Sequence, residues 1–137
     1  MLSLDVGCGE IGLCDVNCDI EKPDRIPENF ILCDSQKLPF KNETFDFVET
    51  FHVIEHIKNP YMFLDEIKRV LVIGGMLKLI CPHRFSSGAK NKGHINFFNR
   101  KWFENNLIGC RASAIFIPHL LIQNIKVRWR KTKNDIK

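Results

Sequence analysis

The stretch LDVGCGEIG at residues 4–12 decides the fold that this sequence predicts. Residues 2–6 have the pattern of a short buried strand, because their apolar side chains run up to a glycine that stops an extended segment. The glycines at positions 7, 9 and 12 then match G-x-G-x-x-G directly after that strand. On its own, this match indicates only a tight backbone turn that a ligand can approach closely.

The segment that follows these glycines is short. A dinucleotide-binding fold would continue with a helix and an acidic residue about 20 positions on. Here Asp15 and Asp19 arrive sooner, and no helical pattern precedes them. Only eight residues separate Val6 from Asp15, whereas a parallel crossover usually takes about a dozen or more. We therefore expect either a missing first helix or a second strand reduced to an extended loop, and the pattern disfavours a nicotinamide-dependent enzyme.

Outward from this stretch, expected strands alternate with expected helices. The Asn59-Pro60 pair starts a helix, since a capping side chain precedes proline at the first helical position, and Gly74-Gly75 is expected to end it. This order predicts an α/β fold in one domain, residues 1–137, whose mostly parallel sheet is covered on both faces and carries an antiparallel pair at one edge. The expected strands are residues 12–19, 30–33, 45–50, 76–81, 112–117 and 121–129, the last two paired across Pro118-His119, with a helical turn at 52–57 and a helix at 99–107.

Bulk composition excludes several classes of protein. A hydrophobic content of 45% with 26% charged residues is typical of a globular chain and not of a disordered one. No apolar run approaches the roughly 20 residues that span a bilayer, and Met1 leads into a core strand rather than a signal peptide. We therefore expect a cytoplasmic protein with no membrane attachment and reduced cysteines. Cys14 and Cys18 lack a second pair that would complete a zinc site.

The two halves of the chain carry opposite charge. Residues 1–60 contain five Lys/Arg against twelve Asp/Glu, and residues 61–137 contain fifteen against four. This asymmetry either holds one domain together internally or creates a basic face for an anionic partner. Nucleic acid is one candidate for the basic C-terminal half, where Trp129 stands among cations, although no RNA-binding module is recognisable.

Four blocks in a fixed order carry a resemblance to a known family. They are LDVGCG at residues 4–9, CDSQKLPF at 33–40, FDFVETFHVIEH at 45–56 and FLDEIKRVLVIGGMLKLICP at 63–82. In order and spacing they resemble the class I S-adenosylmethionine (SAM)-dependent methyltransferases, in particular the small type-11 methyltransferases with an HVIEH-like block, over roughly the first two-thirds of the chain. The resemblance implies a Rossmann-like methyltransferase fold shortened at the first helix, SAM as cofactor and transfer of a methyl group to an acceptor.

The resemblance also implies which residues bind SAM. The first strand end and the glycine turn surround the methionine part, with backbone N–H groups toward its carboxylate and an acidic neighbour toward its ammonium. An acid ending the second strand binds the ribose hydroxyls, and we prefer Asp19 to Asp15. An acid ending the third strand meets adenine, although Asp34 is equally typical of a turn. The cofactor-binding residues are thus Asp5, Gly7, Cys8, Gly9, Asp19, Asp34, Ser35 and Gln36, with Glu49 and Thr50 at the pocket edge.

The block HVIEH at residues 52–56 permits two interpretations. H-x-x-E-H is the inverted zinc-peptidase motif, in which two histidines one helical turn apart bind zinc. The expected helix is too short for that before Asn59-Pro60 ends it, so we expect no metal, with Glu55 and His56 bracing the helix. His52 is the candidate catalytic residue, because histidine can act as a general base near neutral pH. Packing beside the cofactor is its alternative role.

Residues that follow the fourth block, which ends at Pro82, are expected to form the acceptor side of the pocket. His83, Arg84 and His94 are candidates to contact an acceptor, since ligands of open sheets bind where parallel strands end, and residues 86–93 are a candidate lid. We expect a small-molecule acceptor rather than a macromolecule, and apolar surface left without helices would permit a homodimer. The alternative is a degenerate methyltransferase-like protein that acts as a binding partner or a nucleic-acid-associated subunit.

Overall fold

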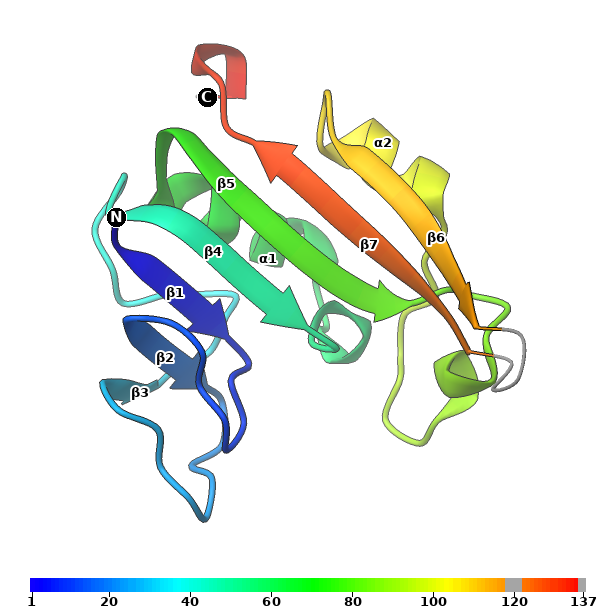
Figure 1. Cartoon of the computed structure of the whole chain (residues 1–137), viewed down its shortest axis with the longest axis horizontal. Coiled ribbons are helices and arrows are strands. Elements are labelled where there is room, and N and C mark those ends of the chain that lie inside the picture. The colour runs from blue at the N-terminus through cyan, green and yellow to red at the C-terminus, as the bar shows by residue number, and fades with distance from the viewer. Residues whose placement is uncertain (118–121, 136–137) are drawn as a thin grey trace.

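The computed structural model of the chain describes residues 1–117 and 122–135. Within these residues, seven strands form one sheet in the order β3-β2-β1-β4-β5-β7-β6 (Figure 1). The strands are β1 (Ser3–Val6), β2 (Val16–Asp19), β3 (Phe30–Leu32), β4 (Phe45–Phe51), β5 (Leu71–Pro82), β6 (Arg111–Ile117) and β7 (Ile122–Arg130). The helices are α1 (Pro60–Val70) and α2 (Arg100–Asn106), with 3-10 turns η1 (Ile54–His56), η2 (Ser87–Lys90) and η4 (Lys133–Asp135).

The sheet combines a parallel part with an antiparallel edge. Strands β3, β2, β1, β4 and β5 run parallel to one another, whereas β7 runs antiparallel to both β5 and β6. The predicted α/β fold with an antiparallel edge pair is therefore confirmed. The turn expected at Pro118-His119 lies outside the described residues.

No helix connects β1 to β2, so the first crossover is as short as the sequence predicts. The strands have four residues each, and the chain must return only about 13 Å, which nine extended residues cover easily at about 3.3 Å each. Asp15 fastens the returning chain, because its Oδ2 accepts hydrogen bonds from the N–H and the hydroxyl of Ser3 at 2.9 and 2.6 Å. The second strand then forms over Val16–Asp19, which is shorter than the expected residues 12–19.

Helix α1 begins as predicted and ends earlier than predicted. The side chain of Asn59 accepts hydrogen bonds from the N–H groups of Tyr61 and Met62, and proline follows as the first helical residue. The helix ends at Val70 and β5 begins at Leu71, so the expectation that Gly74-Gly75 ends the helix is wrong. The glycine pair instead lies inside β5, where the register against β4 shifts, as glycine in a bulge allows.

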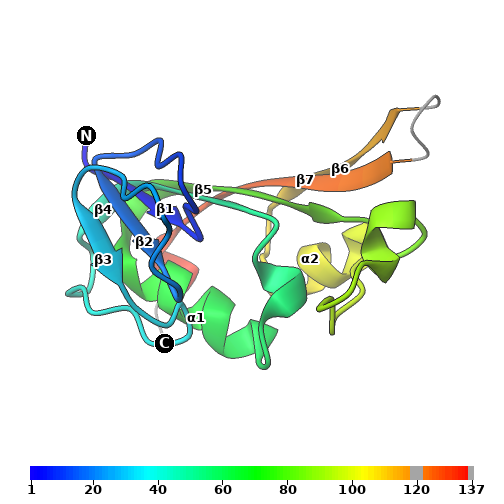
Figure 2. The same cartoon turned by 90° about the horizontal axis from the view of Figure 1, so that it is seen from below.

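Both α-helices in the described part of the chain pack on the same face of the sheet, as Figure 2 shows with the sheet edge-on. The expectation that helices cover both faces is therefore wrong for these residues. The core lies between the sheet and this helical layer, and among its fully buried side chains are Leu4, Val48, Phe63, Ile67, Leu77, Phe103 and Ile125. None of the helices in residues 1–117 and 122–135 has the length and apolarity to cross a membrane.

Candidate functional site

The carboxyl ends of four parallel strands surround a cavity of about 520 Å³. Its walls come from the ends of β1 and β2 and from the turns after β1, β2, β3 and β4, so segments far apart in the sequence meet at this edge of the sheet (Figure 1). Open parallel sheets bind ligands at this edge. Six of the predicted site residues line the cavity: Gly7, Asp19, Asp34, Ser35, Gln36 and His52.

Gly7 brings the end of β1 against the turn that follows β4. Its φ is +77°, and a Cβ at this position would overlap the side chain of Val53, so glycine is required. The N–H groups of Gly7 and Cys8 donate to the carbonyl of Cys18 at 2.8 and 3.1 Å. These two donors therefore already join the turn to β2. To bind a ligand carboxylate, as the sequence predicts, they would have to exchange their hydrogen bonds to Cys18 for hydrogen bonds to the ligand.

Asp19 ends β2 on the wall of the cavity. Its Oδ2 accepts the N–H of Gly9 at 3.0 Å, and its Oδ1 accepts the N–H of Glu21 at 3.3 Å. A carboxylate oxygen has two lone pairs, so each oxygen keeps the capacity for one more hydrogen bond. Two acceptors held in place by backbone donors suit a pair of neighbouring hydroxyl groups.

The turn after β3 forms another wall of the same cavity. Asp34 Oδ1 accepts the N–H of Gln36 at 2.8 Å, so the turn role that this residue type permits is confirmed. Gln36 Oε1 in turn accepts the N–H of Asn59 at 2.9 Å, which ties the turn to the start of α1. The position of Asp34 in the cavity lining leaves it accessible to a ligand.

His52 leaves β4 in a backbone conformation that is uncommon outside glycine, with φ of +56°. Its ring Nδ1 lies 3.1 Å from Oε1 of Glu55, whose side chain is 1% exposed against 49% for His52. With Glu55 as a carboxylate, which can only accept, this contact places the ring proton on Nδ1 and leaves Nε2 as an acceptor. A buried acid therefore orients a histidine ring at the cavity.

Five predicted cofactor residues are outside the lining of this cavity: Asp5, Cys8, Gly9, Glu49 and Thr50. Cys8 and Gly9 act through backbone hydrogen bonds of the first turn. Thr50 is 1% exposed and its hydroxyl has no hydrogen-bond partner among the described residues. The candidate acceptor residues His83 and Arg84 are also outside this lining.

Asp5 and Glu49 pair in register on β1 and β4 and are covered by the loop that follows β1. Leu13 donates its N–H to Asp5 at 3.3 Å, and Cys14 and Lys78 contact Glu49 at 3.7 and 3.1 Å. Burial raises the pKa of Asp5 to about 6, the Leu13 N–H opposes this rise, and the charge of Glu49 adds to it. These two acids hold the loop at Leu13 and Cys14.

The sequence did not single out Val53, Cys18 or Cys33 as lining residues. A hydrogen bond between the two thiols, together with burial, raises the pKa of Cys18, so this thiol stays neutral and packs as a small hydrophobe. Val53 could have been found from the strand pairing, because β1 and β4 are neighbours and their following turns must meet. No sequence pattern predicts the contact between Cys18 and Cys33, since only the register of β2 against β3 brings the two thiols together.

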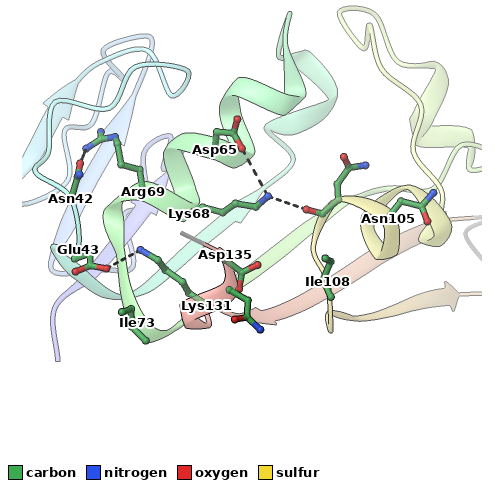
Figure 3. Close-up of a pocket in the computed structure, with 12 residues that line it drawn as sticks. Asn42, Glu43, Asp65, Lys68, Arg69, Ile73, Asn105, Ile108, Lys131 and Asp135 are labelled. Atoms are coloured by element: carbon green, nitrogen blue, oxygen red, sulfur yellow. Dashed lines mark hydrogen bonds and ion pairs between the residues drawn. The ribbon is translucent and has the colours of Figure 1, made fainter. Parts of the chain in front are cut away.

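A second cavity, of about 690 Å³, lies at the opposite end of the parallel strands. Figure 3 shows that its cations point to acceptors within the same cavity: Lys131 to Glu43, at 3.3 Å, and Lys68 to Asp65, at 3.9 Å. Lys68 also donates to the carbonyl of Asn106 at 3.0 Å. These groups satisfy one another, and we assign no function to this cavity.

Comparisons with known proteins agree with this geometry. Residues 4–79 match the family described as methyltransferase domain. The uncharacterized protein MJ1123 of Methanocaldococcus jannaschii is 43% identical over 96 residues, which cover 70% of this chain and 47% of that protein. Norajmaline N-methyltransferase of Rauvolfia serpentina is 30% identical over 146 residues, covering 88% of this chain and 50% of that enzyme.

The fold agrees with solved structures at low sequence identity. A SAM-dependent methyltransferase of Thermotoga maritima, a possible histamine N-methyltransferase, superposes with a TM-score of 0.75 at 18% identity, covering 96% of this chain and 82% of that one. The chain spans about half the length of the curated relatives it matches.

Proposed function

Since the chain belongs to the methyltransferase domain family, we propose that it transfers a methyl group from SAM to a small-molecule acceptor. The observation that carries this proposal is the cavity of about 520 Å³ at the ends of β1 to β4, lined by two strand-end acids and a histidine. A volume of this size suits a small ligand. The acids Asp19, Glu21 and Asp34 at the cavity outnumber its one lysine, Lys58, and so favour a ligand with positive charge.

The residues present fit SAM at three places. Asp19 offers two fixed acceptors for the ribose hydroxyls, and the turn of Asp34, Ser35 and Gln36 supplies polar groups for adenine. Ile20 and Ile57 add apolar surface to the cavity lining. Asp5 and Glu49 act indirectly, by holding the loop after the glycine turn. SAM supplies a methyl group on a sulfonium, an electrophile that needs no further activation.

His52 has the position for a role toward the acceptor. Glu55 holds its Nδ1–H, so Nε2 is free to accept the proton that an acceptor loses when it becomes a nucleophile. The same fixed ring also aligns an acceptor and excludes water, which is the main contribution an enzyme makes to a displacement at carbon. The residues that line the cavity are thereby divided into a cofactor side and an acceptor side.

The cellular setting is part of this proposal. All six cysteines are free thiols in the structure, which supports a reducing compartment such as the cytoplasm. A second candidate function is that of a degenerate family member that serves as a binding partner. The absent first helix and the engaged N–H groups of Gly7 and Cys8 favour it, because both weaken the cradle for the methionine carboxylate.

Calorimetric titration with SAM and S-adenosylhomocysteine separates these functions. We expect micromolar binding in the parent chain and a loss of about 10- to 100-fold in Asp19→Asn, because one charge-assisted acceptor pair is lost. The exposed Asp24→Asn is the matched control and should bind like the parent. Folded protein that gives no heat with either ligand would refute the enzyme and support the binding partner.

A further inference from the structure

Beyond the proposed methyl transfer, we propose that Glu55, His56 and His94 form a binding site for a divalent transition-metal ion such as Zn²⁺, next to the cavity that His56 also lines. One potential ligand atom from each of these residues lies within 4.8 Å of the other two. Carboxylate and imidazole are ordinary zinc ligands at about 2.0–2.2 Å, which places ligand atoms about 3.4 Å apart in a tetrahedral site. Side-chain adjustments of about 1 Å close the difference.

Two buried polar atoms of this cluster lack a partner. Oε2 of Glu55 and Nδ1 of His94 have no hydrogen bond among the described residues, and the Glu55 side chain is only 1% exposed. Buried polar atoms in native proteins are nearly always satisfied by protein, water or an ion. A cation between these two atoms would satisfy both at once.

The remaining hydrogen bonds hold the ligands in the form that a metal requires. Nδ1 of His56 lies 3.0 Å from the carbonyl of Gly93, which can only accept, so the proton is on Nδ1 and Nε2 has a free lone pair. His52 contacts the other oxygen of Glu55 at 3.1 Å. Metal-binding histidines and carboxylates are oriented by such outer hydrogen bonds.

The backbone holds the distant histidine in place. The N–H groups of Ile95 and Asn96 donate to the carbonyl of Glu55 at 2.9 and 3.1 Å. The side chain of Asn96 donates to the carbonyls of Ile54 and Ile57 at 3.3 and 2.6 Å. The segment that carries His94 is thereby fastened to both ends of η1, and a metal would find its ligands assembled.

This ligand set differs from that of the inverted zinc-peptidase motif. In that motif the two histidines of H-x-x-E-H, here His52 and His56, would share a helix. In this structure η1 covers only Ile54–His56, and His52 supports Glu55 instead of facing the metal position. His56 is exposed, so an ion has access to the site, and a water or another ligand can complete the coordination.

Metal titration of the untagged full chain tests the proposal. We expect one Zn²⁺ per chain by calorimetry, with an affinity that rises with pH because the ligands must be deprotonated. Co²⁺ in the same site should give visible d–d absorption without a thiolate-to-cobalt band. His94→Gln and the exposed His56→Gln should each weaken binding by at least about 10-fold, whereas His83→Gln, outside the cluster, should bind like the parent.

Three outcomes would overturn the site. Absence of stoichiometric binding in folded protein would mean that only a water bridges Glu55 and His94. Equal affinity in the parent, His94→Gln and His56→Gln would place the metal elsewhere. A thiolate band with Co²⁺ would assign binding to the six free cysteines. Circular dichroism of each variant, compared with the parent, establishes that a loss of binding is not a loss of fold.

Discussion

The two faces of the sheet are built from the same strands and have different surroundings. On the helical face, Leu77 and Leu79 of β5 and Val127 of β7 are at most 1% exposed. On the other face, Met76 is 42% exposed, and Arg128 of β7 is exposed. Strand alternation alone produces this contrast. The difference teaches that the described helices bury only one face of the sheet, and that charged side chains concentrate on the other face.

The open face is organised by charge across the strands. Asp5, Glu49, Lys78, Arg128 and Arg111 follow one another in register from β1 to β6. The acids stand under the loop after β1, and the cations stand where no helix covers them. The opposite charges of the two halves of the sequence therefore meet on this face, with Lys78 and Glu49 in contact at 3.1 Å.

Substitutions at two adjacent residues of β5 should show the largest difference in stability between the two faces. Leu77→Ala should lower the free energy of unfolding by about 2–5 kcal/mol, because it leaves a cavity in the buried core. Met76→Ala, one position away on the open face, should change it by less than about 1 kcal/mol. Urea denaturation measures both. Similar losses from the two variants would show that the open face is also a packed one.

Asp5 tests the part of the open face that is covered by a loop. Its pKa is raised to about 6, so the folded state binds a proton more tightly than the unfolded state. The free energy of unfolding should therefore fall as the pH rises from about 4 to about 6. Asp5→Asn removes this penalty and should stabilise the protein at pH 7 by up to about 3 kcal/mol, with no gain at pH 4.

Urea denaturation across this pH range measures the effect of Asp5. The exposed Asp24→Asn is the control and should follow the parent chain. A gain in Asp5→Asn that is the same at pH 4 and pH 7 would contradict the raised pKa and indicate a packing effect.

Arg128 tests the uncovered part of the same face and should have the smallest effect. Arg128→Ala should change the free energy of unfolding by less than about 0.5 kcal/mol, because the side chain is exposed. A loss above about 1 kcal/mol that grows with protein concentration would reveal a second copy on this face. Denaturation at two concentrations and sedimentation would then establish the homodimer that exposed apolar surface permits.

Much of this architecture is readable from the sequence. The cap at Asn59-Pro60, the strand ends at Val6 and Asp19 and the short first crossover all follow from local residue types. The start of β5 does not follow from local residue types. Leu71 is buried and pairs with β4, so the strand begins before the glycine pair in the sequence. The alternation of apolar and charged residues in β5 and β7 was the available signal for a one-sided sheet.

The candidate site likewise has residues that the sequence predicts and residues that it does not. Gly7, Asp19 and Asp34 could be placed because each lies at or just after the carboxyl end of a strand, and parallel strands bring such positions together. The cluster of Glu55 and His94 could not, since it depends on a loop folding back along η1 with no sequence pattern to announce it. Asp5 and Glu49 were assigned to the pocket from the family resemblance, and in this structure their side chains contact Leu13 and Cys14 of the loop after β1.

The helix-free connection between β1 and β2 determines where the chain can accept inserted residues. The entropic cost of closing a loop grows slowly, by about 0.6 kcal/mol for each doubling of its length. Ile11 and Leu13 are 76% and 65% exposed in this connection, so added residues would meet solvent rather than the core. The connection is therefore the point at which this sheet would accept an inserted segment while keeping its strand order.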